Sequence, residues 1–295
     1  MAARKTLLLA GAGDLAQRAA GHFLARFPNA RVIGVRRQPP PTAGHIEWLA
    51  GDLTDPACIA ALPSGITHIL YAATPDARHA DAYRRIFITA PDILLAGLDT
   101  TALERLLFVS STAVYADDCM DATATAAPAW TDEQTPTTPD SFNGQILLEA
   151  EQRFQQHLPA RTVTLRCAGL YGPGRTYLLR RLLAGHAHVP PMAQPRWINR
   201  IHIDDAARAC VHLLALPESA SCYIGSDGHP QSMRTFYEAL ATMLGAPAPA
   251  EEALPHTCGK RLSNARLLAS GFELHWPDPL AAYASLIKAA QHTPQ

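Results

Sequence analysis

Long apolar runs are missing from this 295-residue chain. No stretch reaches the roughly 18 apolar residues that a membrane-spanning helix needs, so no membrane segment is predicted. The apolar run in the opening MAARKTLLLAGAG is too short for a signal peptide and is broken at once by glycine. The six cysteines are scattered without a Cys-x-x-Cys pair, which favours a reduced, cytoplasmic protein.

The chain also lacks an excess of positive or negative charge. The formal net charge is -1, and acidic and basic residues are mixed along the chain, which argues against a nucleic-acid partner. Histidines His186 and His188 stand close together, but no cluster of Cys, Asp or Glu ligands accompanies them, so no metal site is predicted. With 48% hydrophobic and 17% charged residues, the composition is that of a globular protein with a large buried core.

Short apolar runs alternate with helical patterns through the first half of the chain. Helices are predicted over residues 14–26 and 143–157, and a long helical stretch contains Arg84 and Arg85. Strands this apolar, separated by helices, predict an α/β fold with a Rossmann-type, doubly wound parallel sheet. The predicted strands are residues 6–11, 31–36, 67–73, 105–111 and 162–169.

The second half of the chain changes character at the sequence YGPGR. A basic helix around Arg180 and Arg181 and a proline-rich stretch follow, and SCYIGS is predicted to be the last strand of the main sheet. Residues 122–139 and 245–255 are predicted to be loops. We therefore expect a dinucleotide-binding domain in residues 1–170, to which the chain returns at about 200–226. A small C-terminal substrate lobe is expected from residues 171–199 and 227–295.

A glycine-rich turn follows the first predicted strand and opens a helix. Gly11, Gly13 and Ala16 form the pattern G-x-G-x-x-A. The first glycine permits a tight turn, the second lets the backbone approach a pyrophosphate, and the small third residue allows the helix to pack closely on the strand. Because the pattern begins a βαβ unit, it predicts dinucleotide binding, with Ala12, Asp14 and Leu15 also near the cofactor.

The end of the second predicted strand usually selects between NAD and NADP. An acidic residue there would bind the ribose 2′-hydroxyl, but this chain has Arg36 and Arg37. Guanidinium groups bind phosphate through paired hydrogen bonds, so the two residues favour NADP. Two solvated arginines at a strand end are the alternative interpretation.

Several motifs in the expected order resemble the short-chain dehydrogenase/reductase superfamily, in its extended or atypical NAD(P)-dependent epimerase/dehydratase branch. GDLTD resembles the segment near adenine, YAATP the backbone beside the cofactor, and FVSSTAVYA the strand that ends in a catalytic serine. AGLYGPGR, NRIHIDD and GKRLSNARL most resemble the YeeZ-like atypical group. The resemblance implies cofactor contacts at Asp52, Leu53, Ala72, Ala73 and Ser110.

The resemblance also implies a catalytic Tyr-x-x-x-Lys pair, which this chain does not have. Ser111 falls on the catalytic serine, but Asn143 stands at the tyrosine position and Leu147 at the lysine position. Leucine has neither charge nor donor, and asparagine is no general acid near neutral pH, although Asn143 can hydrogen-bond a substrate oxygen.

Three residues are candidates for the missing proton donor: Tyr115, Tyr171 and His202. For each, a packing or hydrogen-bonding role is the alternative. Cys167, near the expected nicotinamide position, is interpreted as a small apolar residue rather than a nucleophile.

Two functions remain open from the sequence. One is an NADP-dependent oxidoreductase or epimerase-like enzyme with relocated acid-base residues, and the other is an NADP-binding sensor or scaffold without turnover. The enzyme is the favoured interpretation because Ser111 is retained and the substrate lobe looks complete. Arg175, Arg200 and His202 are expected at the substrate, which is predicted to be a small or nucleotide-linked molecule. A solvated arginine face is the alternative interpretation of the arginines. The protein is expected to be a monomer or homodimer.

Overall fold

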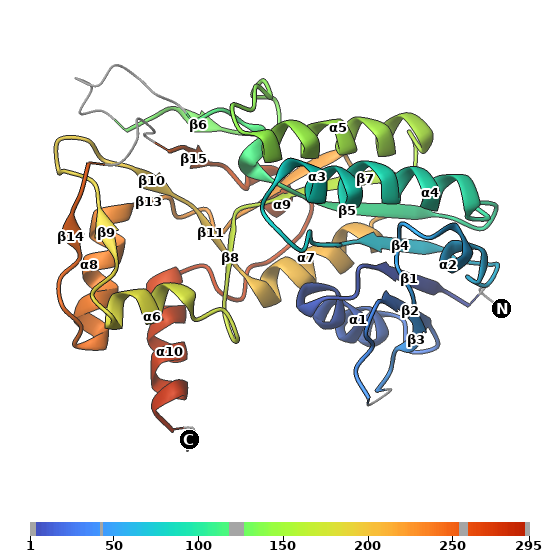
Figure 1. The fold of residues 1–295 in the computed structure, drawn as a ribbon, viewed down its shortest axis with the longest axis horizontal. Helices are drawn as coiled ribbons and strands as arrows, with labels where there is room; N and C mark the ends of the chain where they lie inside the picture. The colour runs from blue at the N-terminus through green and yellow to red at the C-terminus, as the bar shows by residue number, and fades with distance from the viewer. Residues whose placement is uncertain (1–3, 42–43, 118–126, 254–258, 293–295) are drawn as a thin grey trace. The chain divides into compact units, whose positions relative to one another are not determined.

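The structure is a computed structural model that describes residues 4–41, 44–117, 127–253 and 259–292. Its main feature is a seven-stranded sheet with the strand order β12-β7-β5-β4-β1-β2-β3 (Figure 1). The strands are β1 (Thr6–Ala10), β2 (Arg31–Arg36), β3 (Glu47–Ala50), β4 (His68–Tyr71), β5 (Arg105–Ser111), β7 (Thr162–Cys167) and β12 (Cys222–Gly225). The pairs β1–β2, β1–β4, β2–β3 and β4–β5 are parallel.

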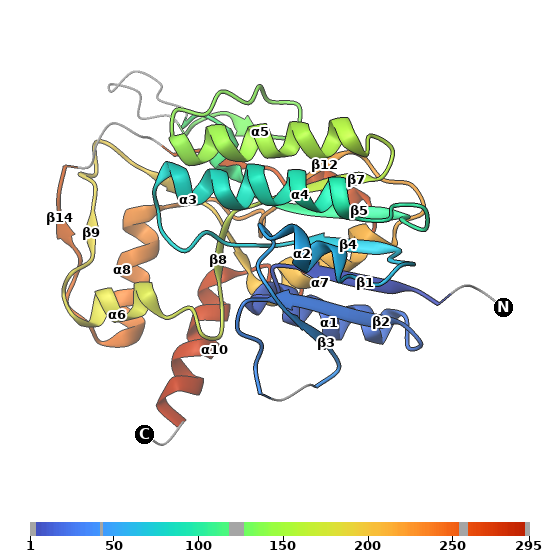
Figure 2. The ribbon, with the colours of Figure 1, turned by 45° about the vertical axis from the view of Figure 1, so that its right-hand side comes forward.

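The sheet confirms the predicted fold class. Every residue of β1, β4 and β7 is buried, as expected for strands covered on both faces. In both views of the ribbon, α3, α4 and α5 cover one face of the sheet, and α1 and α7 cover the other (Figures 1 and 2). These helices are α1 (Asp14–Arg26), α3 (Ala80–Arg84), α4 (Ala90–Gly97), α5 (Phe142–His157) and α7 (Ile203–Ala215), and the short α2 (Pro56–Ala60) follows β3.

The strand order reverses between β1 and β4. The chain runs from β1 outward through β2 to β3, then returns to β4 on the other side of β1. In such sheets, ligands bind beyond the carboxyl ends of the strands at this reversal. The turn after β1 is therefore the expected cofactor position.

The long helix predicted around Arg84 and Arg85 is divided. A π-helical turn, η1 (Arg85–Thr89), separates α3 from α4. Pro91 has no N–H to continue the ladder, and the Tyr71 hydroxyl donates to the Ile86 carbonyl oxygen at 2.5 Å. The strand predicted over 67–73 is also shorter, because β4 spans only His68–Tyr71.

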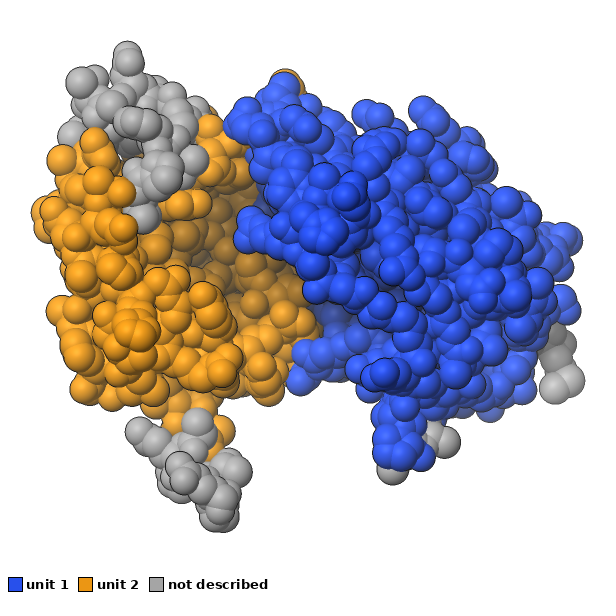
Figure 3. Space-filling model, in the orientation of Figure 1, with its two compact units in different colours: residues 1–115, 137–166, 206–223 blue, residues 116–136, 167–205, 224–295 orange. Residues whose placement is uncertain are grey.

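The chain forms two compact units (Figure 3). Unit 1 comprises residues 1–115, 137–166 and 206–223, and unit 2 comprises residues 116–136, 167–205 and 224–295. Unit 1 contains most of the sheet and, after β5, the 3-10 turn η2 (Thr112–Val114).

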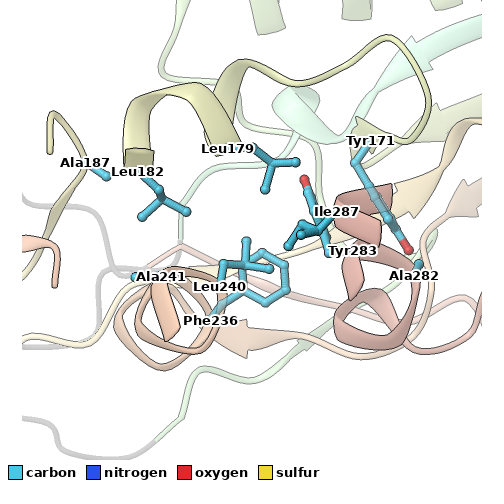
Figure 4. Close-up of a cluster of buried hydrophobic side chains, with 10 residues drawn as sticks. All are labelled: Tyr171, Leu179, Leu182, Ala187, Phe236, Leu240, Ala241, Ala282, Tyr283 and Ile287. Atoms are coloured by element: carbon cyan, nitrogen blue, oxygen red, sulfur yellow. The ribbon is translucent and has the colours of Figure 1, made fainter. Parts of the chain in front are cut away.

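Unit 2 is built from helices and short strand pairs. Tyr171, Phe236 and Tyr283 are the aromatic members of its apolar cluster (Figure 4). Its helices are α6 (Tyr177–Leu183), α8 (Met233–Leu244), α9 (Ala265–Ala269) and α10 (Pro279–His292). Its strands are β6 (Trp130–Thr131), β8 (Gly169–Tyr171), β9 (His188–Val189), β10 (Trp197–Ile198), β11 (Arg200–His202), β13 (Gln231–Ser232), β14 (Ala250–Glu251) and β15 (Arg261–Leu262).

The two predicted loops contain short strands where the structure describes them. β6 lies within 122–139 and pairs with β15, and β14 lies within 245–255 and pairs with β9. Residues 122–126 and 254–255 of these loops lie outside the described residues.

Candidate functional site

The turn after β1 uses its two glycines for different purposes. Gly11 has φ +87°, and a Cβ there would lie 2.3 Å from the Ala73 Cα atom, so only glycine fits. A Cβ on Gly13 would meet no atom within 4 Å, which leaves room on this side of the backbone. Gly13 is also the N-cap of α1, and no side chain caps this helix. The turn thus presents an open helix N-terminus, which suits an anionic pyrophosphate.

A cavity of about 180 Å³ lies beside this turn in unit 1. The structure brings together most of the predicted cofactor residues here: Gly11, Ala12, Gly13, Arg36, Arg37, Asp52, Leu53, Ala72 and Ala73. Asp14, Leu15 and Ser110 are not among the lining residues. The sequence reasoning missed Val35, Gly51, Thr74 and Ile86 as lining residues. Ile86 carries no sequence signal for this position, because η1 brings it to the cavity.

Two ion pairs lie at the edge of this cavity. Arg37 donates to both carboxylate oxygens of Asp76, at 2.7 and 2.5 Å. Asp52 accepts from the Thr54 N–H and hydroxyl through Oδ1 and from Arg85 through Oδ2. Burial opposes ionisation of Asp52, but these hydrogen bonds and the charge of Arg85 hold its pKa below the ordinary value. Arg36 is exposed and forms no ion pair with a residue that the structure describes.

The residues that the resemblance places at catalytic positions lie at the end of β5 and on α5. Ser111 is the N-cap of η2, and its Oγ accepts from the Ala113 N–H at 3.2 Å. A Cβ on Gly144 would lie 2.1 Å from the Ala113 carbonyl oxygen, so the first turn of α5 packs against η2 backbone. Asn143 is half-buried in this first turn, and Leu147 is buried one turn later. No cation stands at either position.

A buried polar network follows on the same side of α5. Glu151, two turns after Asn143, accepts from Ser110 Oγ at 2.6 Å and from Arg166 Nη2 at 2.6 Å. Arg166 Nη1 donates to the Tyr115 hydroxyl at 2.7 Å. Burial would lower the pKa of Arg166, but the hydrogen bonds and charge of Glu151 raise it, so the guanidinium stays charged. Sequence reasoning missed Glu151 and Arg166.

The other two candidate proton donors lie in unit 2. Tyr171 is buried, stacks on Tyr283 with a centroid distance of 4.8 Å, and meets the His202 ring at 5.2 Å. Its hydroxyl has no hydrogen-bond partner among the described residues, and burial raises its pKa. His202 is buried against Trp276, and its Nδ1 accepts from the Asp204 N–H at 3.3 Å.

The predicted substrate arginines also lie in unit 2. Arg175 follows β8 and is half-buried, and Arg200 begins β11 with its guanidinium 4.7 Å from the Phe236 ring centroid. The Arg200 Nε atom is buried without a hydrogen-bond partner among the described residues.

Asp227 is a buried carboxylate that the sequence reasoning missed. Its Oδ1 accepts from the His229 N–H at 2.9 Å, whereas its buried Oδ2 has no partner among the described residues. Burial raises the pKa of Asp227 to about 7, against the nearby charge of Arg200. Its one sequence signal is its place in GSDG directly after the last strand of the sheet.

The remaining sequence candidates have ordinary surroundings. His188 Nδ1 lies 2.8 Å from a Glu252 carboxylate oxygen, and the described residues contain no group of three or more His, Cys, Asp or Glu placed to bind a metal. Cys167 is buried, and burial raises the pKa of its thiol to about 12. Within the described ranges, no helix has the length and apolar character to cross a membrane.

Comparisons with known proteins identify the family of this chain. The sequence profile of the NAD dependent epimerase/dehydratase family matches residues 12–224. Protein YeeZ of Escherichia coli (strain K12) is 31% identical over 211 residues, which are 70% of this chain and 71% of YeeZ. A structure from Methylobacillus flagellatus, assigned to the NAD-dependent epimerases/dehydratases, is 30% identical with a TM-score of 0.77, and the match covers 98% of this chain and 99% of that one.

The fold extends to more distant proteins. The UDP-glucose 4-epimerase of Thermotoga maritima is 15% identical with a TM-score of 0.77, over 98% of this chain and 100% of that chain, a likeness of fold alone. The profile match and the YeeZ relative confirm the predicted resemblance. The chain belongs to the NAD dependent epimerase/dehydratase family and is a relative of protein YeeZ.

Proposed function

We propose that the protein is an NADP-dependent oxidoreductase or epimerase/dehydratase-like enzyme that acts on a small or nucleotide-linked substrate with non-standard acid-base residues. The observation that carries this proposal is the cavity beside the glycine turn in unit 1. The glycine turn, the uncapped N-terminus of α1 and the arginine pair Arg36 and Arg37 at the end of β2 all adjoin it. The residues present therefore fit a dinucleotide with a pyrophosphate and a 2′-phosphate.

A nicotinamide cofactor would supply the hydride chemistry, which is why the enzyme does not depend on one particular protein nucleophile. Gly13 and the first turn of α1 would hold the pyrophosphate, and Arg36 would hold the 2′-phosphate. The Ser111 hydroxyl and the Asn143 amide, on neighbouring turns, can hydrogen-bond a substrate oxygen. Neither group is a general acid near neutral pH, so proton transfer needs another residue.

The three candidate proton donors differ in the contacts that their side chains already make. The Tyr115 hydroxyl is already bonded to Arg166, and the His202 ring packs against two aromatic rings. The Tyr171 hydroxyl has no protein partner among the described residues and stays protonated because burial raises its pKa. This hydroxyl is free to donate a hydrogen bond to a substrate oxygen, which keeps Tyr171 the favoured candidate. Proton transfer from it requires that a bound substrate or cofactor lower its raised pKa.

Cofactor choice is tested by isothermal titration. NADPH should bind at least about tenfold tighter than NADH, as one charge-assisted phosphate contact would provide. Arg36→Gln should remove most of this preference, while Arg78→Gln, an exposed arginine outside the cavity lining, should not. Equal affinities in the wild-type protein would refute the NADP assignment.

Catalysis is tested by NADPH consumption with carbonyl and nucleotide-sugar substrates. The variants Ser111→Ala, Tyr115→Phe, Tyr171→Phe and His202→Gln should then be compared. Removing the true donor should reduce kcat by about 10²–10⁴-fold. Full activity in all four variants would show that the catalytic residues are assigned wrongly.

An NADP-binding sensor or scaffold is the second candidate function. It is favoured by Leu147, a buried apolar residue where the family carries its catalytic lysine. In that case, NADPH should bind and change the protein's shape or partners, but no substrate should give turnover.

The substrate proposal rests on unit 2. Arg175 and Arg200 are half-buried, and the Arg200 guanidinium lies over the Phe236 ring of the apolar cluster. With His202, these two cations would suit a phosphate or carboxylate group on the substrate. If this is correct, Arg200→Gln should raise KM for anionic substrates and leave NADPH affinity unchanged.

A further inference from the structure

Arg37 is already engaged at the edge of the cofactor cavity. It follows the last residue of β2, and its partner Asp76 follows β4 by five residues. These two strands flank β1, so the pair joins the strand ends on either side of the glycine turn. The contact is bidentate, because Nη1 and Nη2 of Arg37 each donate to one oxygen of Asp76. A phosphate group would bind the same edge of the guanidinium.

The charges around this pair alternate. Hydrogen bonding to Asp76, and then its charge, raise the pKa of Arg37, and the charge of Asp52 contributes in the same direction. Arg85, which pairs with Asp52, also helps to hold the pKa of Asp76 below its ordinary value. Two cations and two anions therefore balance one another, and Arg36 is the cavity-lining arginine left outside this balance.

We propose that Asp76 is a specificity-determining residue, whose carboxylate competes with the ribose 2′-phosphate of the cofactor for Arg37. This inference rests on the proposed binding of NADP. Both side chains are about half exposed, so separating the ion pair costs little free energy and a phosphate can displace the carboxylate. Arg36 binds without a competitor, whereas Arg37 binds the phosphate only by releasing Asp76. A cofactor without the 2′-phosphate leaves the pair closed.

The test compares Asp76→Asn with the wild-type protein by isothermal titration. The ligands are NADPH and NADH, and 2′,5′-ADP and 5′-AMP, which report on the adenosine end alone. We expect NADPH and 2′,5′-ADP to bind about two- to fivefold tighter, the range that one exposed ion pair supports, with NADH and 5′-AMP unchanged. Asp81→Asn is the matched control, because it removes the same charge from an exposed residue outside the cavity lining and should change nothing.

A second background separates competition for Arg37 from a general field effect. In Arg37→Gln, the further change Asp76→Asn should no longer tighten NADPH binding, because no guanidinium remains to be released. The proposal is overturned if Asp76→Asn leaves NADPH affinity unchanged or lower, if it tightens NADH equally, or if its gain persists without Arg37.

The same titrations distinguish this failure from failure of the proposed cofactor. If the wild-type protein prefers NADH and Arg36→Gln has no effect on NADPH, the NADP assignment is wrong. A selective gain in Asp76→Asn would even then support the competition. If NADPH is preferred through Arg36 and Asp76→Asn has no effect, only the role of Asp76 is wrong.

Discussion

The two units treat their buried polar groups differently. In unit 1, Ser110, Glu151, Arg166 and Tyr115 satisfy one another in a closed network. Among the described residues of unit 1, only Trp48 has a buried side-chain polar atom without a partner. In unit 2, the Tyr171 hydroxyl, Arg200 Nε, Asp227 Oδ2 and Gln231 Oε1 are all buried without protein partners among the described residues.

Such unpaired groups cost stability, so they are expected where a protein binds something rather than where it only packs. This difference supports separate binding roles for the two units. Unit 1 is self-sufficient in its interior and offers backbone and charge to a dinucleotide at its edge. Unit 2 keeps donors and acceptors without protein partners among the described residues, which fits the substrate site that we propose there.

The largest expected loss of stability comes from breaking the buried polar network of unit 1. Glu151→Ala should lower the free energy of unfolding by about 3–5 kcal/mol, because it leaves the Arg166 charge buried and unpaired. Urea unfolding followed by circular dichroism measures this loss. The control Glu104→Ala opens the exposed pair with Lys5 and should cost at most about 1 kcal/mol. Similar losses in the two variants would mean that the buried network does not stabilise unit 1.

Dinucleotide binding should depend on unit 1 through Gly13. Gly13→Val should weaken NADPH binding by at least about a hundredfold, because its side chain takes the space that the pyrophosphate needs. The protein should stay folded, since a Cβ at this position meets no atom within 4 Å. Gly21→Val, which places the same side chain in open space farther along α1, is the binding control. A folded Gly13→Val protein with wild-type affinity would show that the cofactor is held elsewhere.

Removing the hydroxyl of one buried tyrosine in each unit compares the stability of the two units directly. Tyr115→Phe should cost about 1.5–3 kcal/mol of unfolding free energy, because it removes a hydrogen bond to a charged group. Tyr171→Phe should be neutral or stabilising, because its hydroxyl has no protein partner to lose. Thermal and urea unfolding of both variants measure the difference. An equal loss in the two variants would remove the contrast between the units.

The smallest effect is a pH dependence in unit 2. The pKa of Asp227 is about 7 in the folded protein and near 3.8 when unfolded, so the folded state binds the extra proton between these values. Stability therefore falls as pH rises from about 4 to about 7, and the penalty is complete above pH 7.

Replacing this carboxylate tests the direction of the predicted change of stability with pH. Asp227→Asn should raise the unfolding free energy at pH 8 by at least about 1.4 kcal/mol, the equivalent of one pKa unit, relative to its effect at pH 4. Parallel Tm profiles of variant and wild-type protein across this range would contradict the assignment of a raised pKa to Asp227.

Much of unit 1 could be predicted from the sequence because its signals are local. The spans of α1, β2 and β5 agree with the predicted residues, since each is a continuous periodic or apolar segment. Gly11 and Gly13 are fixed by the turn itself, and the absence of the Tyr-x-x-x-Lys pair is a property of one helix. The π-helical turn was missed because helical periodicity continues through Pro91.

Only the tertiary structure decided which distant side chains meet. Asp76 reaches Arg37 because β2 and β4 flank β1. Glu151 reaches Arg166 because α5 packs on β5, the neighbour of β7 in the sheet. Asp227 has its raised pKa because of burial, which no neighbour in the sequence reveals. The sequence by itself determined the strand-turn-helix unit that can approach a dinucleotide, since backbone sterics act over a few residues. The partners of the charged and polar side chains depend on contacts across many tens of residues, which only the folded chain creates.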